Sequence, residues 1–378
     1  MEDYYLQQLR EKIRRLEYDK LSHEVLLKFI EESSEKGIEF RKELENAKSE
    51  TLKFLNKIKD TIIKHTKLDS PEKLEDLPSA GVDGSNQVVG GKFGKFYIML
   101  AAGISKFLDG PSKNCEIEFS DVKIVSYYDP TGSRVYSVAE DLMLELETKA
   151  IYHFVNKDAP RDQTSYLILD GPIIDPPRYP VGYTKSHNDY ISYRAKAILS
   201  GINRDPPVIV LGYNKRVMGF LFKKHIESKV GESMKTTYSD FDVLSIIFLE
   251  LLSKDRSIYY TKPIKNTEVD VAREYEKNGL TVYSSFSMFS PRSPVFRVDI
   301  ATDETFSEQD ISKLMNDAML FLRASTLPGM KYPIQITTIH EKVSIRRGAA
   351  EVIYNEILTK AASTGEEMIR ILTSFLVE

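Results

Sequence analysis

Two apolar runs that end in an Asp-Gly pair, far apart in the chain, most constrain the fold. The first spans residues 81–86 (GVDGSN) and the second spans residues 166–172 (YLILDGP). Apolar runs of this kind favour buried strands, and glycine lets the backbone turn away after the carboxylate. We therefore expect Asp83 and Asp170 at the ends of neighbouring strands, where two carboxylates can hold a divalent cation.

The composition excludes several classes of protein. The 378 residues are 42% hydrophobic, which is ample for one large domain or for a core with a helical appendage. No apolar run reaches the ~18 residues of a membrane span, and the first residues lack the pattern of a secretory signal. A single cysteine, Cys115, excludes an internal disulfide framework and a cysteine-based zinc site. These features predict a cytoplasmic protein without contact to a membrane.

The net charge of −4 gives the chain no overall basic character. Binding to a nucleic acid would therefore require basic residues gathered in one place. Candidate pairs are Lys92 with Lys95, Lys215 with Arg216, Lys223 with Lys224, and Arg346 with Arg347. Each pair by itself is typical of a solvated surface.

The spacing of apolar residues predicts three parts. Residues 1–68 carry two Lys/Glu-rich amphipathic stripes separated at Gly37, which indicates a helical arm folded as an antiparallel hairpin. Its role stays open between a packing arm and an arm for dimerisation or docking of a partner. A linker over 70–78 leads to a core at 78–346, and residues 347–378 form a C-terminal helix that packs on the core or on a partner.

Within the core, the pattern predicts an α/β fold with a mixed sheet and flanking helices. Expected strands are 96–104, 117–128, 166–169, 208–211, 281–286, 295–300 and 334–339. Expected helices are 139–155, 189–199, 217–229, 241–252, 308–324 and 349–375.

The helix expected at 139–155 offers a third carboxylate. Glu147 lies four residues after Met143 and four before Ile151, so it falls on the apolar stripe, whereas Glu145 falls among polar residues. A buried carboxylate costs several kcal/mol unless it is paired or bound to a metal. Glu147 is therefore the better candidate ligand, and a one-turn error in the pattern would exchange it for Glu145.

A histidine supplies the fourth candidate. The run 334–339 reads as a strand, and His340 follows it at the expected sheet edge. Histidine can bind a metal, hold a phosphate or protonate a leaving oxygen.

Together these elements resemble the NurA nuclease family of archaea and some bacteria. The resemblance rests on Val82-Asp83-Gly84-Ser85, on the helix around Glu147, on 167–172, and on Tyr332-Pro333 followed by His340, and it covers roughly residues 78–346. The segments 211–215 and 296–300 match more loosely. Lys331 and Ile339 stand where the family pattern has glycine and alanine, and Tyr213 and Asn214 stand where small or apolar residues are common.

The resemblance implies an RNase H-like core and a homodimer that degrades DNA ends from the 5′ side in recombinational repair. It implies dependence on Mn²⁺ or Mg²⁺ and partnership with the HerA hexameric ATPase. Asp83, Glu147 and Asp170 would be the metal carboxylates, and His340 would be the fourth member of the active site. Carboxylates from two strands and a helix could hold two ions, with Lys215 neutralising the scissile phosphate.

Three other interpretations stay open. One is an RNase H-like nuclease that acts on RNA or branched DNA, and another is a non-catalytic adaptor of a DNA motor. The third is an actin-type ATPase or kinase-like enzyme, in which Asp-Gly turns hold a metal-bound phosphate. The chain has no Gly-Lys-Ser/Thr after a glycine-rich loop, so no Walker motif supports nucleotide hydrolysis.

Overall fold

The computed structural model describes residues 23–65, 77–110, 114–174, 185–235, 237–255, 257–266, 271–327 and 329–362. The chain divides into two compact units, Met1–Leu55 and Asn56–Glu378. Most of the expected linker lies outside the described residues, as does the chain beyond residue 362.

The first unit contains most of helix α2 (His23–Lys57). The helix runs through Gly37 without interruption, so the break expected there is wrong. A glycine inside a helix costs only about 1 kcal/mol relative to alanine, and the Lys/Glu-rich flanks are good helix formers. The first predicted stripe lies outside the described residues. Ile38, Phe40 and Leu44 on α2 are exposed.

The second unit is built on one large mixed sheet. Its strands are β1 (Ile62–His65), β2 (Ser79–Gly90), β3 (Lys95–Phe107), β4 (Glu116–Tyr128), β5 (Ser165–Leu169), β6 (Val208–Asn214), β7 (Ile258–Thr261), β8 (Ile264–Lys265), β9 (Thr281–Ser287) and β10 (Phe296–Thr302). The strand order is β1-β7-β9-β10-β6-β5-β2-β3-β4, and β8 pairs with β9 beside this path.

Five of these strands form the part of the sheet that matters for the site. β2, β3 and β4 are antiparallel neighbours, whereas β2, β5 and β6 run parallel. Parallel neighbours need a crossover helix, and α3 and α4 supply it. The resulting order β4-β3-β2-β5-β6 is that of the RNase H-like core which the resemblance implied. The predicted mixed sheet with flanking helices is therefore confirmed.

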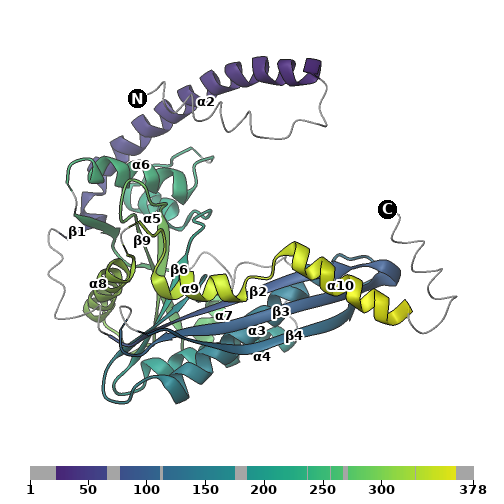
Figure 1. The fold of residues 1–378 in the computed structure, drawn as a ribbon. Helices are drawn as coiled ribbons and strands as arrows, with labels where there is room; N and C mark the ends of the chain where they lie inside the picture. The colour runs from purple at the N-terminus through teal and green to yellow at the C-terminus, as the bar shows by residue number, and fades with distance from the viewer. Residues whose placement is uncertain are drawn as a thin grey trace. The chain divides into compact units, whose positions relative to one another are not determined.

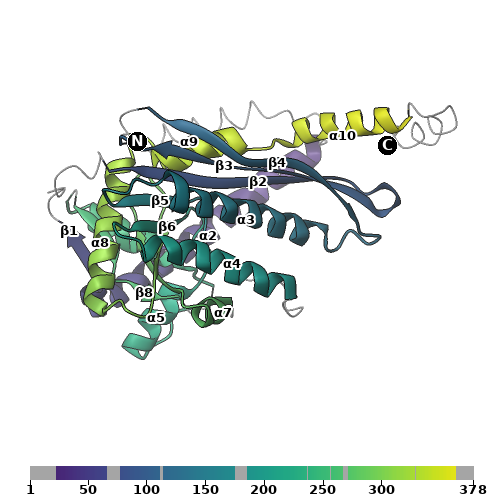
Figure 2. The same cartoon turned by 90° about the horizontal axis from the view of Figure 1, so that it is seen from below.

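Helices cover both faces of this sheet. They are α3 (Val135–His153), α4 (Lys185–Ile202), α5 (Leu221–Val230), α6 (Asp240–Leu252), α7 (Val271–Lys277), α8 (Glu308–Ser325), α9 (Ile334–Val343) and α10 (Arg347–Ala362). Figures 1 and 2 show α3 and α4 on one face of β2–β4, and α9 and α10 on the other. No helix within the described ranges is long and apolar enough to cross a lipid bilayer.

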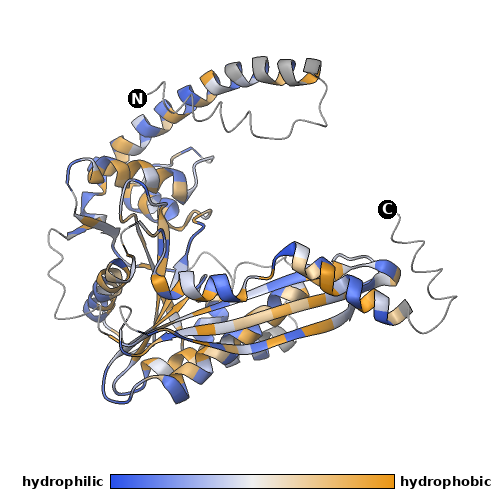
Figure 3. Ribbon diagram, in the orientation of Figure 1, coloured by the Kyte–Doolittle hydropathy of each residue, from blue (hydrophilic) through white to orange (hydrophobic). Residues whose placement is uncertain are grey.

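β5 shows how the sequence creates two buried layers. Leu167 and Leu169 join the core cluster under α3 and α4. Tyr166 and Ile168 point to the other face and join the cluster under α8, where the Tyr166 ring stacks on Phe321 at 4.0 Å. A strand buried on both faces is apolar at every position, which explains the unbroken run before Asp170. Figure 3 shows hydrophobic positions recurring along the strands and on the helices against them.

The structure corrects the interpretation of the segment before His340. The strand expected at 334–339 is the helix α9, which begins after Pro333. Ile336, Ile339 and Val343 are buried at the three- and four-residue spacing of one helix face. The β-branched residues favour strands only as a weak preference, and packing of this face on β2 and β3 overrides it. His340 therefore lies on a helix over the sheet and not at a strand end.

Asp83 also differs from the expectation. β2 continues for seven residues beyond it, paired with β3 along its whole length. The Asp83-Gly84 pair is thus extended strand in the middle of β2, and the chain does not turn there. Asp170 directly follows β5, as expected.

Candidate active site

Pairing of β2 with β5 brings the first two carboxylates together. Val82 lies opposite Leu169 in the parallel register, and the Asp170 amide donates to the Val82 carbonyl over 2.9 Å. Asp83 and Asp170 are the next residues of the two strands. Both side chains are largely buried, with 7% and 10% of their surface exposed. The prediction that two neighbouring strands deliver these carboxylates to one place is therefore correct.

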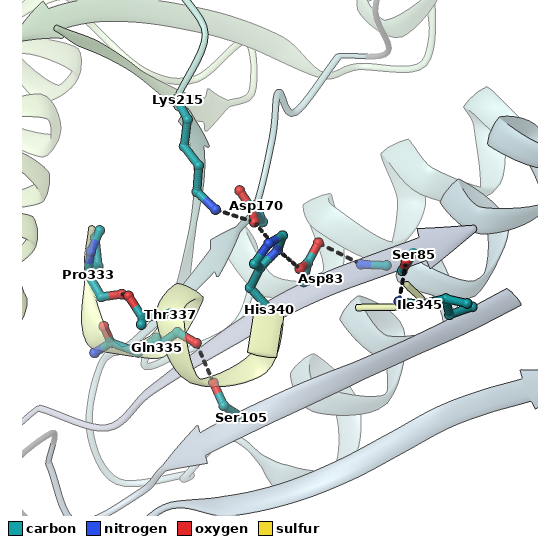
Figure 4. Close-up of polar contacts among 11 residues, drawn as sticks. Asp83, Ser85, Ser105, Asp170, Lys215, Pro333, Gln335, Thr337, His340 and Ile345 are labelled. Atoms are coloured by element: carbon teal, nitrogen blue, oxygen red, sulfur yellow. Dashed lines mark hydrogen bonds and ion pairs between the residues drawn. The ribbon is translucent and has the colours of Figure 1, made fainter. Parts of the chain in front are cut away.

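α9 places His340 over this pair (Figure 4). The imidazole Nδ1 lies 2.7 Å from Asp83 Oδ2 and 3.3 Å from Asp170 Oδ2. The helix is fixed to the sheet at its start, because Ser105 Oγ donates to the Gln335 carbonyl and Gln335 Nε2 donates to Ser79 Oγ. The side chain of His340 is 55% exposed, so its ring faces both the carboxylates and solvent.

β6 adds a cation on the other side of Asp170. Lys215 follows the last residue of β6, and its Nζ lies 2.5 Å from Asp170 Oδ2. The ammonium also lies 4.7 Å from the centre of the Tyr332 ring. The second carboxylate thus contacts both His340 and Lys215.

The Asp-Gly-Ser sequence has a separate structural reason at each position. Asp83 faces α9 and accepts a hydrogen bond from the Gly84 amide at Oδ1. Gly84 faces α3, since consecutive residues of a strand point to opposite faces. Ser85 Oγ accepts from the Ile345 amide over 3.0 Å, which ties the segment after α9 to β2.

The buried position changes the ionisation of Asp83. Burial raises its pKa to about 6, and the negative charge of Asp170 acts in the same direction. The hydrogen bond and charge of His340, and the charge of Lys215, partly oppose this rise in pKa. A buried carboxylate whose charged form is disfavoured in this way is typical of a site that binds a cation.

Asp83→Asn is expected to stabilise the metal-free protein above pH 6. The carboxyl has its ordinary pKa of 3.8 in the unfolded chain and a pKa of about 6 in the folded one, so the folded state binds the proton more tightly. Its favourable contribution is fully present below pH 3.8 and is lost as the pH rises through 6. Because asparagine stays neutral, the free energy of unfolding should increase by about 3 kcal/mol at pH 8.

Urea unfolding in EDTA at pH 8 and at pH 4 measures this difference. The difference between the variant and the wild type should be much smaller at pH 4, where Asp83 is protonated in the folded state and the unfolded carboxyl is close to its pKa of 3.8. A stability difference of the same size at both pH values would contradict the raised pKa.

Glu147 lies on the opposite face of β2 from His340. A β-carbon built on Gly84 would lie 2.8 Å from Glu147 Oε1, so the carboxylate is packed against the backbone beside Asp83. Its side chain is buried, whereas that of Glu145 is half exposed and pairs with Lys149. The apolar stripe therefore identified the inward carboxylate. At this site, ligand atoms of Asp83, Asp170 and His340 lie within 4.8 Å of one another. Glu147 does not belong to this group, so its metal-binding role stays a prediction.

A pocket of about 860 Å³ opens beside Asp170 and His340. Basic side chains on its wall are Lys215, Arg216, Lys224 and Arg297, and aromatic ones are Tyr213, Phe220 and Phe286. The basic lining gives the local positive charge that the overall composition lacks. Such a wall suits a phosphate backbone, and the exposed ring of Phe220 can stack on a base, whereas Tyr213 and Phe286 are buried.

Arg297 on this wall was missed from the sequence as a functional candidate. Its Nε lies 3.0 Å from Asp299 Oδ1, and Asp299 is fully buried. Asp299 also accepts from Asn214 Nδ2 and from Ser284 Oγ, so the arginine is held rigidly at the pocket. The signal was available in the segment 295–300, where two charged residues alternate with apolar ones inside a strand. It did not show that the two charged residues pair with each other, or that Arg297 faces the pocket.

A second group of acids and a histidine has a different explanation. Ligand atoms of Glu118, His153 and Asp158 also lie within 4.8 Å of one another. Lys106 Nζ lies 2.8 Å from Glu118 Oε2 and 3.5 Å from Asp158 Oδ2, and the lysine side chain is buried. This group carries its own cation and joins β3 and β4 to the segment after α3.

The first group is the better candidate for a divalent cation, because Lys215 contacts only one of its two carboxylates, whereas Lys106 contacts both carboxylates of the second group. Its two carboxylates suit Mg²⁺ or Mn²⁺, and the imidazole adds a nitrogen donor that transition metals accept. The set of Asp83, Asp170 and His340 therefore fits Mn²⁺ well.

Comparison with known proteins agrees with this geometry. A family model, the NurA domain, matches residues 79–345. No curated protein matches the sequence. The crystal structure of the NurA nuclease from Sulfolobus solfataricus is 14% identical, with 92% of this chain and 99% of that chain covered and a TM-score of 0.59. A second structure of NurA is 11% identical, with 92% and 100% covered and a TM-score of 0.52. At these identities the structures show a common fold.

Proposed function

The chain belongs to the NurA family of nucleases, and from this premise we propose that it is a metal-dependent deoxyribonuclease. It degrades DNA ends from the 5′ side and cleaves single strands internally, in end resection for recombinational repair. One observation carries the proposal: Asp83, Asp170 and His340 converge next to a pocket lined by basic and aromatic side chains.

The chain's own groups divide the work of phosphodiester hydrolysis. Asp83 and Asp170 would hold Mn²⁺ or Mg²⁺, and Glu147 would complete the carboxylate set. A bound divalent cation supplies charge that acidifies water and offsets the charge of the phosphate. Lys215 presents Nζ to the same region and would neutralise the scissile phosphate. His340 is exposed enough to reach the DNA and can hold the phosphate or protonate the leaving oxygen.

The pocket supports a nucleic acid as the substrate. Arg297 is oriented by Asp299, and Lys215 lies between Asp170 and Tyr332, so two cations flank the path of a strand. Phosphate contacts of this kind do not depend on base sequence. An unpaired strand end would place a phosphate near the carboxylates and a base near the exposed ring of Phe220.

We also propose that the protein is a homodimer and works with a HerA-type hexameric ATPase that feeds DNA to the site. Membership of the NurA family supports both the homodimer and the partnership with the ATPase. The exposed Ile38, Phe40 and Leu44 on α2 support a docking role for the helical arm, because exposed apolar groups mark interaction surfaces.

The test is digestion of 5′-labelled DNA by the purified chain. With Mn²⁺ the label should be released from double- and single-stranded ends, and EDTA in excess should abolish release. Matched RNA and branched DNA substrates separate the alternative nuclease specificities. Absence of digestion with Mn²⁺, both alone and with the hexameric ATPase, would contradict the proposal and favour the adaptor.

A further inference from the structure

One buried arginine, which is not part of the carboxylate group, packs between the segments that carry Asp170 and Glu147. Arg194 on α4 is 1% exposed. Burying a guanidinium is costly unless charge and hydrogen bonds compensate. The guanidinium of Arg194 therefore requires hydrogen-bond acceptors and a nearby negative charge, and the structure provides both.

The partners of Arg194 come from two segments. Nε donates to the Ile173 carbonyl over 3.1 Å, and a terminal nitrogen donates to the Pro172 carbonyl over 3.4 Å. On α3, Nη1 donates to Thr148 Oγ1 over 3.2 Å and lies 3.9 Å from Glu147 Oε2.

Each segment carries an acid of the proposed active site. Pro172 and Ile173 follow Asp170 by two and three residues and form the exit of the chain from β5. Glu147 is packed against Gly84, the residue after Asp83. One planar side chain thus connects the turn behind Asp170 with the helix that carries Glu147.

We propose that Arg194 is a positioning residue of the active site, which holds Glu147 and the turn after Asp170 in the arrangement that binds the metal. The proposal rests on the proposed nuclease function. The arginine touches neither substrate nor metal, because it lies behind the carboxylates in the core. Its flat fork of donors fits two carbonyls and a hydroxyl at once, which a lysine ammonium cannot reproduce.

If Arg194 had only a structural role, its substitution would lower stability and leave the metal requirement unchanged. Arg204 offers a matched control for this case. Arg204 donates to the carbonyls of Val155 and Ala159 over 2.9 and 2.8 Å. Arg204 lies two residues after the end of α4 and makes the same kind of contact to the segment after α3, away from the carboxylates. Arg194→Lys and Arg204→Lys should lower the melting temperature by similar amounts.

Only the Arg194 change should alter the metal requirement. In Arg194→Lys, the Mn²⁺ concentration for half-maximal DNA cleavage should rise about tenfold, as for other residues that orient metal ligands. The KM for DNA should stay within about twofold, since phosphate contacts are untouched. Calorimetric titration of Mn²⁺ into each variant checks the same shift without catalysis.

A double-mutant cycle with Glu147→Gln tests whether the arginine acts through that carboxylate. If it does, Arg194→Lys should have little further effect in the Glu147→Gln background. If Arg194→Lys does not fold, Thr148→Val replaces it, because it removes the hydroxyl that orients the guanidinium beside Glu147.

Two outcomes would overturn the inference. One is a wild-type Mn²⁺ requirement in folded Arg194→Lys or Thr148→Val, and the other is an equal shift in Arg204→Lys. These results are distinct from failure of the proposed function, which would appear as absence of metal-dependent cleavage by the wild-type protein itself.

Discussion

Asp170→Asn is expected to lower the rate of DNA cleavage at saturating Mn²⁺ by at least about a hundredfold, which is ~2.7 kcal/mol of transition-state stabilisation. Asp170 contacts His340 at 3.3 Å and Lys215 at 2.5 Å, so it is the carboxylate shared by the most functional groups. Asparagine keeps its shape and can still accept from Lys215. The loss of cleavage rate would therefore reflect removal of the negative charge and not a change in the packing of the side chain.

Binding of DNA should change little in Asp170→Asn, because the basic wall of the pocket is intact. Fluorescence anisotropy of labelled DNA in Ca²⁺ measures the dissociation constant, which should stay within about threefold of the wild type. Asp158→Asn is the matched control, since Asp158 belongs to the second group of acids around Lys106. Wild-type cleavage by Asp170→Asn, or an equal loss in Asp158→Asn, would contradict the placement of the active site.

The position of Asp170 could be predicted because it depends on local pattern, whereas its adjacency to Asp83 depends on the pairing of β5 with β2. An unbroken apolar run identifies β5 as a strand buried on both faces, and an acid at its end must lie at the edge of the core. Parallel pairing with β2 then fixes the second carboxylate. The inward direction of Glu147 followed from the 3.6-residue period in the same way.

The position of His340 could not be predicted in the same way. Its neighbours Ile334, Ile336 and Thr338 favour a strand by composition, and the alternation of a short segment fits either structure. The deciding fact is that α9 packs across β2, where Gly81 would place a β-carbon 2.5 Å from the Gln335 carbonyl. A contact between residues so far apart in the chain leaves no local signal.

The pairing of charged residues inside the protein is the other feature that could not be predicted from the sequence. Arg194, Arg297 and Asp299 stand in segments where charged residues normally face solvent or end an element. Arg194 and Asp299 are buried because groups from distant segments hydrogen-bond to them, and the partly exposed Arg297 pairs with Asp299 on the same strand. A single sequence names such residues but does not pair them, so the basic wall of the pocket emerged only from the fold.

Gly84→Ala is expected to lower the cleavage rate by about a hundredfold, since displacement of a catalytic group by ~1 Å has effects of that size. The added β-carbon would lie 2.7 Å from Met143 Cγ and 2.8 Å from Glu147 Oε1. Contacts this short force the neighbours to move. Both belong to flexible side chains, so the Glu147 carboxylate is displaced from β2 while the backbone stays in place.

Stability should change much less than activity, and this separates a displaced carboxylate from a damaged core. Overpacking costs about 1–3 kcal/mol, which thermal unfolding measures, and Gly348→Ala is the control because nothing lies within 4 Å of its added carbon. Glu147→Gln combined with Gly84→Ala should be no slower than the slower single variant, since both changes remove the same group. If Gly84→Ala cleaves DNA at the wild-type rate, Glu147 has no part in the reaction. The glycine after Asp83 would then be required only for packing, and the active site would consist of Asp83, Asp170, His340 and Lys215.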